Sequence, residues 1–202
     1  MDGGRHMYKM LSTIIYSRIK LFRLLKIEGK ENIPYNHRFV VTCSHKGWVD
    51  VIILAIALYP TPVHYMAKQE LFAGKWGNRF FRSVKAFPVN RENPGPSALK
   101  IPIKLLKENK CVGIFPSGTR TSEDVPLKRG AVTIALKANA PLLPASFQGP
   151  ATLSDLFKGT KSSVVFGKPM MFDDIKKMDK NEQINEAVRL LEQEMRELEA
   201  KH

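Results

Sequence analysis

The chain has 202 residues, of which 44% are hydrophobic and 25% are charged. This composition excludes a largely disordered chain, and the length fits one globular domain or at most two small ones. Lys and Arg number 32 against 19 Asp and Glu, so the formal net charge is +13. Residues 1–177 alone carry +16, because residues 178–202 hold seven acidic and four basic residues. The charge predicts an anionic partner, which leaves nucleic acid, an anionic membrane and a phosphorylated substrate open.

The two cysteines, Cys43 and Cys111, lie in separate apolar runs rich in β-branched residues. The sequence has no CxxC pair and no cysteine spacing typical of a disulfide framework or a metal site. We therefore interpret both thiols as small buried side chains of a protein in a reducing compartment, and we predict no metal site.

Residues 7–27 are predicted to form a separate unit ahead of the main domain. We expect Met7 to be the natural start, so residues 1–6 and the terminal His202 carry no functional interpretation. Apolar side chains recur at spacings of three and four from residue 8 to residue 27, which predicts an amphipathic helix. Its five basic residues make crossing a bilayer costly, and Arg18 lies within the apolar stripe. We favour a helix that lies on an anionic membrane surface; the alternative is a helix that covers the core of the domain itself.

Short β-branched runs then alternate with helical patterns along residues 28–202. Strands are predicted at 39–43, 63–67, 84–89, 111–115, 142–147 and 163–166, and helices at 49–59, 70–81, 98–108, 129–139 and 181–200. Strands and helices taking turns are typical of an α/β fold. The sequence therefore predicts a single α/β domain with a largely parallel mixed sheet flanked by helices.

The first candidate catalytic pair is His45 and Asp50. His45 follows the predicted strand 39–43, and Asp50 falls in the first turn of the next predicted helix. On one regular helix the two side chains would lie about 140° apart, so they can meet only if His45 lies in the turn before the helix, which Gly47 permits. A carboxylate bound to one imidazole nitrogen leaves the other as a base for a hydroxyl group. The alternative is a loop histidine and an aspartate that stabilises the start of the helix.

A second candidate site follows the fourth predicted strand. Ser117, Gly118, Thr119 and Arg120 form a small-residue turn that ends in a cation. Ligands of α/β proteins bind at the carboxyl ends of strands. Gly118 would let backbone N–H groups approach an anion, Arg120 can bind a phosphate through two hydrogen bonds, and Lys128 adds positive charge near the next predicted helix. The alternative is a tight turn with a surface arginine.

Two weaker blocks complete the pattern, namely an apolar strand that leads to Arg91 and an apolar strand flanked by Pro141 and Pro144. In their order and spacing the four blocks resemble the glycerolipid acyltransferase family, in particular its bacterial lysophosphatidic acid acyltransferases. The family's H-x-x-x-x-D block is matched by His45 and Asp50, its strand ending in Arg by Arg91, its F-P-E-G-T-R block by residues 115–120 with Ser117 in place of Glu, and its last block by Pro141 and Pro144.

The resemblance implies that a fatty acyl chain passes from a thioester to the sn-2 hydroxyl of lysophosphatidic acid. The thioester would be on coenzyme A or acyl carrier protein, as a substrate, with no further cofactor. His45 would act as the base, Asp50 would orient it, and the turn at Ser117, Gly118 and Thr119 could stabilise the developing oxyanion. The acceptor phosphate would be held by Arg91, Arg120, Lys46 and Lys128.

The expected partners are therefore an anionic membrane surface, a lysophospholipid and an acyl carrier, and the expected location is the cytoplasmic face of the cell membrane, without a membrane span. Two other function classes stay open. Ser117 could serve a lipid hydrolase as nucleophile, although no G-x-S-x-G elbow surrounds it. The basic body could bind nucleic acid, although no helix-turn-helix, zinc-finger or RNP signature is present, so we expect no nucleic-acid partner.

Overall fold

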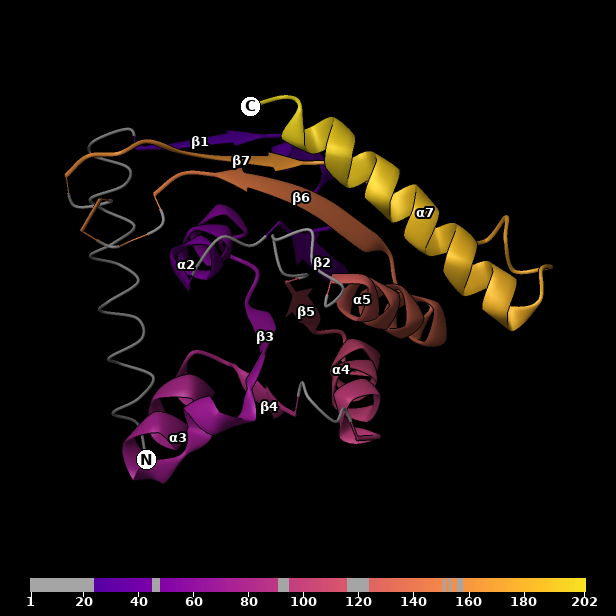
Figure 1. The fold of residues 1–202 in the computed structure, drawn as a ribbon, viewed down its shortest axis with the longest axis horizontal. Coiled ribbons are helices and arrows are strands. Elements are labelled where there is room, and N and C mark those ends of the chain that lie inside the picture. Colours follow the sequence, from indigo (N-terminus) through magenta and orange to yellow (C-terminus); the bar gives the residue numbers. More distant parts are fainter. Residues whose placement is uncertain are drawn as a thin grey trace.

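The structure is a computed structural model and describes residues 24–44, 48–90, 95–115, 124–150, 152, 154, 155 and 158–202 (Figure 1). Its centre is a seven-stranded sheet in the order β1-β7-β6-β2-β5-β3-β4. The strands are β1 (Leu25–Glu28), β2 (Val40–Cys43), β3 (Val63–Lys68), β4 (Phe87–Val89), β5 (Cys111–Ile114), β6 (Leu142–Gln148) and β7 (Ser162–Phe166). The described helices are α2 (Trp48–Ala57), α3 (Gly74–Ser83), α4 (Ser97–Lys107), α5 (Asp124–Ala138) and α7 (Lys180–Glu199), with short 3-10 turns η1 (Lys30–Asn32) and η2 (Gln69–Phe72).

The sheet is mixed, with one long parallel part. Strands β6, β2, β5, β3 and β4 all run in the same direction. Strand β7 is antiparallel to β6, and β1 pairs with β7 in parallel. The prediction of a single α/β domain with a largely parallel mixed sheet is therefore confirmed.

Two apolar layers cover the two faces of this sheet, because successive side chains of a strand point to opposite faces. Val41 of β2 packs in one layer with buried residues of α2 such as Ile53. Val40, its neighbour in β2, packs in the other layer with buried residues of α4, α5 and α7. Figure 1 shows α2 on one side of the sheet and α4, α5 and α7 on the other. Among the described residues, no helix is both long and apolar enough to span a membrane.

Local backbone geometry explains where the elements differ from their predicted bounds. The predicted helix 70–81 is divided into η2 and α3, and the chain turns at Gly74, whose φ is 74°. The strand predicted from residue 84 begins only at Phe87, after Lys85 with φ 62°.

The prediction that the N-terminal helix extends to Ile27 is wrong for its last three residues, because Leu25–Glu28 form β1. An apolar spacing that suits a helix does not exclude a strand when a partner such as β7 is available. The rest of that predicted helix lies outside the described residues.

The buried layer beneath α4 is expected to carry much of the stability. Leu106 of α4 is fully buried, whereas Leu71 of η2 is 47% exposed. We expect Leu106→Ala to lower the free energy of unfolding by about 2–5 kcal/mol, since it leaves a cavity, and the matched variant Leu71→Ala to leave it nearly unchanged. Urea denaturation followed by circular dichroism measures both, and equal losses would contradict the assignment of this layer as the core.

Candidate active site

The candidate residues follow strands whose carboxyl ends meet at one edge of the sheet. Ser44 follows β2, Phe115 follows β5 and Asn90 follows β4. Because these strands are parallel, all three chain segments leave the sheet at the same edge. Thr42 pairs with Ile114, so the chain leaves β2 and β5 at nearly the same level, with the strands about 4.8 Å apart.

The connections that follow β2 and β5 lie on opposite faces of the sheet. The chain leaves β2 into α2, which packs on one face, and leaves β5 toward α5, which packs on the opposite face. Adjacent parallel strands with connections to opposite faces open a crevice outside their carboxyl ends, the usual ligand site of open α/β sheets. The first and the third sequence blocks both begin at this point.

Asp50 is the one predicted catalytic residue that the structure describes. It lies in the first turn of α2, which the short connection 44–47 joins to the end of β2, and it is 1% exposed. Burial raises the pKa of the Cys43 thiol far above its usual range, and the nearby Asp50 carboxylate raises it further. A carboxylate buried this deeply needs hydrogen-bond donors or a positive neighbour. Asp50 is therefore placed where it could orient a group of the adjoining connection.

Ser44 and Phe115, at which the chain leaves β2 and β5, are anchored in the core. Phe115 is 6% exposed, and its ring stacks on that of Tyr65 in β3 with centroids 5.6 Å apart. A Cβ on Gly113 would come within 2.5 Å of the Tyr65 ring, so glycine at this place in β5 is what lets that ring lie there. On the other strand, the Ser44 hydroxyl accepts a hydrogen bond from the Phe147 N–H at 3.3 Å. Sequence reasoning did not single out Tyr65 or this Ser44 contact, because both depend on strand order.

Lys128 faces α7. Its Nζ lies 3.3 Å from Glu192 Oε1, and the two side chains are 22% and 30% exposed. Next to it, Arg129 donates a hydrogen bond to Asn185 Oδ1 at 2.6 Å. Lys128 and Arg129 of α5 therefore both contact α7, a structural role that the sequence pattern did not reveal.

The other predicted site residues lie outside the described residues: His45, Lys46, Arg91, Ser117, Gly118, Thr119 and Arg120. The described residues that precede each of these segments are at the carboxyl edge of the sheet.

The two cysteines are buried, as the sequence predicts, and neither forms a disulfide. Burial raises the pKa of Cys111 to about 11, and that of Cys43 is raised even more. Both thiols are therefore protonated at neutral pH and are poor nucleophiles. Within the described residues, no group of three His, Cys, Asp or Glu side chains could hold a metal ion.

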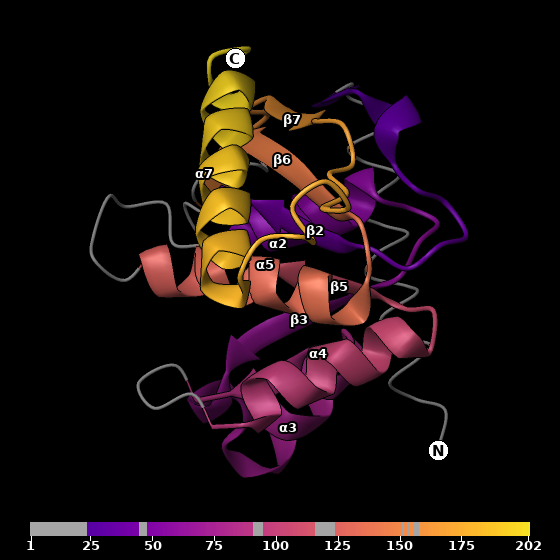
Figure 2. The ribbon, with the colours of Figure 1, turned by 90° about the vertical axis from the view of Figure 1, so that its right-hand side faces the viewer.

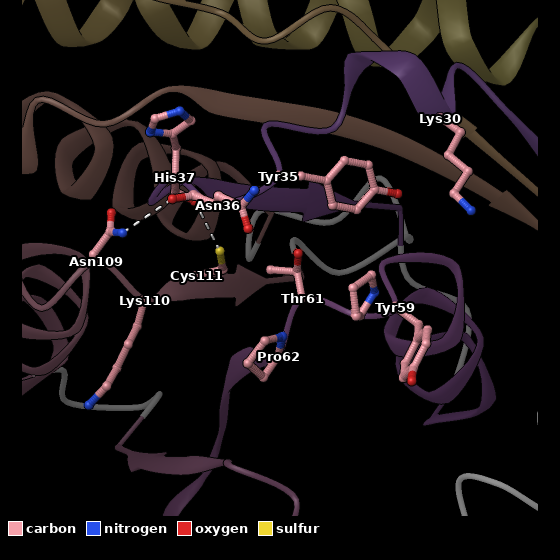
Figure 3. Close-up of a pocket in the computed structure, with 11 residues that line it drawn as sticks. Lys30, Tyr35, Asn36, His37, Tyr59, Thr61, Pro62, Asn109, Lys110 and Cys111 are labelled. Atoms are coloured by element: carbon pink, nitrogen blue, oxygen red, sulfur yellow. Dashed lines mark hydrogen bonds between the residues drawn. The ribbon is translucent and has the colours of Figure 1, made fainter.

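A cavity of about 680 Å³ lies at the opposite edge of the sheet (Figure 3). Its lining includes Tyr35, His37, Thr61 and Lys110, which lie beside the amino ends of β2, β3 and β5. The Cys111 thiol donates a weak hydrogen bond to the His37 carbonyl across its floor, at 3.5 Å. The first and third sequence blocks follow the carboxyl ends of β2 and β5, so the cavity is separate from the candidate active site.

Comparison with known proteins identifies the class to which this fold and site belong. The profile of a protein family described as Acyltransferase matches residues 24–148, a span that runs from β1 to the end of β6 and includes all four blocks. The chain belongs to the acyltransferase family, which confirms the resemblance found in its sequence.

Particular relatives share most of the chain. The 1-acyl-sn-glycerol-3-phosphate acyltransferase of Bacillus subtilis (strain 168) is 50% identical over 195 residues, which cover 96% of this chain and 98% of that protein. The protein of the same name from Streptococcus pneumoniae (strain ATCC BAA-255 / R6) is 36% identical over 187 residues, covering 89% and 68%. The crystal structure of the 1-acyl-sn-glycerophosphate (LPA) acyltransferase PlsC from Thermotoga maritima has the same fold, with a TM-score of 0.64 and 24% identity over 99% of this chain and 84% of that one.

The ion pair between Lys128 and Glu192 can be measured by a double-mutant cycle. We expect Lys128→Met and Glu192→Gln each to lower the free energy of unfolding slightly, with a coupling energy of at most about 1 kcal/mol because both side chains are partly solvated. Chemical denaturation of the parent, the single variants and the double variant gives this energy. A coupling energy of zero would show that the pair does not help to hold α7.

Proposed function

We propose that this protein is a lysophosphatidic acid acyltransferase, which moves a fatty acyl chain from an acyl thioester to the sn-2 hydroxyl of lysophosphatidic acid and yields phosphatidic acid. The observation that carries the proposal is the parallel pairing of β2 with β5, because the H-x-x-x-x-D block and the block of residues 115–120 directly follow the carboxyl ends of these two strands. The names of the relatives in Bacillus subtilis and Streptococcus pneumoniae support the same activity.

The proposed chemistry is direct transfer with His45 as general base. One imidazole nitrogen accepts the proton of the acceptor hydroxyl as its oxygen attacks the thioester carbonyl carbon. The C–O bond forms, the C–S bond then breaks, and the thiol of the carrier leaves with the proton that His45 returns. Asp50, buried at the start of α2, accepts a hydrogen bond from the other imidazole nitrogen and stabilises the imidazolium. No covalent enzyme intermediate is required.

In the proposed mechanism the third block, residues 115–120, stabilises the negative charge that develops during the reaction. Backbone N–H groups at Gly118 and Thr119 would stabilise the oxyanion that forms on the thioester carbonyl. Ser117 stands where the family has a carboxylate, so the block lacks that negative charge beside the anionic acceptor. The anchoring of Phe115 against Tyr65 fixes the point at which this block leaves the sheet.

Cations from different strands would hold the acceptor phosphate. In the sequence Arg120 comes after β5 and Arg91 comes after β4, and β4 is two strands farther along the sheet than β5. Guanidinium groups suit this role because they bind phosphate through paired hydrogen bonds. Lys46 adds a further positive charge, whereas Lys128, in its ion pair with Glu192, contributes to the surrounding positive potential more than to a direct contact.

The acyl donor is proposed to be a thioester of coenzyme A or of acyl carrier protein, since both present the same reacting group. The proposed location is the inner face of the cell membrane, where the lipid acceptor is found. Basic and apolar residues of the segment 8–27 would bind anionic headgroups and the acyl boundary beneath them.

Two substitutions distinguish direct acyl transfer from the mechanism of a serine hydrolase. We expect His45→Ala to lower kcat by about 10²- to 10⁴-fold, because the base is lost. Ser117→Ala should keep most of the activity and form no acyl-serine. Mass analysis of the products from purified protein, mixed acyl thioesters and lysolipids measures both variants. If Ser117→Ala is inactive and the parent traps an acyl group on Ser117, the hydrolase is correct and the proposal fails.

The membrane role of the N-terminal segment is testable by charge reversal in the full chain. Deleting residues 8–27 would also remove most of β1, so substitution is the cleaner change. Since each cation near an anionic surface contributes about 1 kcal/mol, we expect Lys9→Glu, Lys20→Glu and Arg23→Glu together to weaken binding to phosphatidylglycerol vesicles by at least about a hundredfold.

The matched control reverses three exposed lysines on the main domain, Lys161→Glu, Lys177→Glu and Lys180→Glu. Vesicle sedimentation measures both sets of variants against the parent. Equal losses in the two sets would show that net charge alone, and not the segment 8–27, controls binding.

A further inference from the structure

Helix α3 and the turn η2 before it carry the most exposed aromatic side chain of the described chain. Trp76 is 88% exposed, Phe80 is 48% exposed, and Leu71 of η2 is 47% exposed. Trp76 and Phe80 are four residues apart, so they lie on one face of α3. Large apolar side chains gathered on one exposed surface mark an interaction site more often than a chance arrangement.

Helix α3 packs against η2 through a face other than the one that carries Trp76 and Phe80. The Phe81 ring packs against that of Phe72 in η2 with centroids 5.4 Å apart. A Cβ on Gly77 would come within 2.7 Å of the Leu71 carbonyl oxygen, so a residue without a side chain is needed there. All of α3 is described and none of its residues is buried. It is therefore a projecting helix, fixed to η2 through one side and open to solvent on the side that carries Trp76.

Helix α3 itself is basic, and Glu70, the one acidic residue of the preceding turn η2, lies 4.0 Å from Lys68. The sequence of α3, GKWGNRFFRS, has no acidic residue and contains Lys75, Arg79 and Arg82. Lys75 is next to Trp76 in the sequence and Arg79 is next to Phe80. Arg82 donates a hydrogen bond to Asn78 at 2.7 Å. Cations beside aromatic side chains are the composition of helices that lie at the interface of an anionic bilayer.

The acidic residues of the C-terminal segment lie away from α3. Figure 2 shows α3 at the lower end and the C-terminal end of α7 at the upper end. The segment 178–202 that contains α7 has seven acidic residues against four basic ones. This excess of acidic residues therefore belongs to a part of the molecule that lies away from α3.

The exposed face also lies close to the candidate active site. Turn η2 starts directly after Lys68, the last residue of β3, and so begins at the carboxyl edge of the sheet. Strand β3 is the neighbour of β5, from which the third sequence block leaves. A surface bound through Leu71 and α3 would therefore face the edge at which a lipid acceptor has to enter.

We propose that Leu71, Lys75, Trp76, Arg79 and Phe80, the α3 surface, dock on a bilayer that contains anionic phospholipid. The inference deepens the proposed function, because it names a membrane contact in addition to the segment 8–27 and gives that contact the role of turning the carboxyl edge of the sheet toward the lipid. A projecting helix fits a fluid surface, into which the amphipathic ring of Trp76 and the ring of Phe80 can insert.

The test uses the full chain and vesicles of phosphatidylcholine and phosphatidylglycerol in equal parts. Because each cation near such a surface adds binding free energy, we expect Lys75→Gln with Arg79→Gln to lower the partition coefficient about 30-fold. We expect Trp76→Ala with Phe80→Ala to lower it at least about tenfold, since the apolar contact is lost.

Matched control variants carry the same types of change at the far side of the molecule. Lys177→Gln with Lys180→Gln removes two exposed cations, and Met171→Ala with Met178→Ala removes two exposed apolar side chains. Both control variants should keep the parent's partition coefficient within about threefold. In a separate readout, brominated phosphatidylcholine in the vesicles should quench tryptophan fluorescence of the parent, and Trp76→Phe should remove most of this quenching.

Activity on two acceptors separates failure of this inference from failure of the proposed function. A short-chain lysophosphatidic acid below its micelle concentration needs no membrane, so the α3 variants should turn it over like the parent while losing turnover of acceptor embedded in vesicles. If the parent acylates neither acceptor but its partition still depends on α3, the proposed function fails and the α3 surface stands.

Three results would overturn the inference. The partition coefficients of the α3 variants could equal that of the parent, or the control variants could lose as much binding as the α3 variants. The α3 variants could also bind vesicles normally and lose activity only with a thioester on acyl carrier protein, which would make the α3 surface a protein-binding site.

Discussion

Parallel pairing of β2 with β5 is the constraint on which the candidate active site depends. These strands are far apart in the sequence, and the chain reaches β5 only after passing through β3 and β4. With Thr42 opposite Ile114, the H-x-x-x-x-D block and the third block begin side by side at one level. A slip of one residue would turn every side chain of β5 to the other face, and Gly113 would no longer lie opposite Tyr65. The packing that fills the core thus also fixes the relative height of the two blocks.

Burial of Asp50 is the second constraint on the candidate active site, because a buried carboxylate restricts which groups can lie next to it. A carboxylate that is 1% exposed is tolerated only with polar partners, and its charge disfavours a second anion nearby. The Cys43 thiol, at the end of β2, shows this effect directly, since both burial and Asp50 raise its pKa. The surroundings of Asp50 therefore favour a cationic neighbour. The imidazolium that would form on His45 during proton transfer would be such a cationic neighbour. The Cys43 thiol, which stays neutral, would not take the proton from it.

Much of this arrangement could be predicted from residue patterns, and the exceptions have physical causes. Alternation of strands and helices is sufficient to predict the parallel sheet, because a helix between two strands returns the chain to the same edge of the sheet, so that both strands run in the same direction. The pattern could not reveal β1, whose four residues continue an apolar helical stripe and become a strand only through pairing with β7. Similarly, Lys128 has the sequence context of a phosphate ligand, and its ion pair with Glu192 depends on the docking of α7, 64 residues later in the chain. Local spacing encodes local structure, whereas strand order and helix docking depend on contacts between distant residues.

The charge of the chain is unevenly distributed, which bears on how the protein would be oriented at a membrane. The acids are concentrated in the C-terminal segment 178–202, and the body of the chain before it carries +16. For a soluble substrate such asymmetry would add only a steering force, which salt screens beyond about 10 Å. For the proposed acceptor, which would be held in a membrane, an asymmetric charge distribution would also orient the protein relative to the bilayer. Orientation matters here since the carboxyl edge of the sheet is only one side of the protein, and an enzyme bound through any other side would present its crevice to water. The same basic residues that make the chain unusual in composition can therefore decide which side of the sheet meets the lipid.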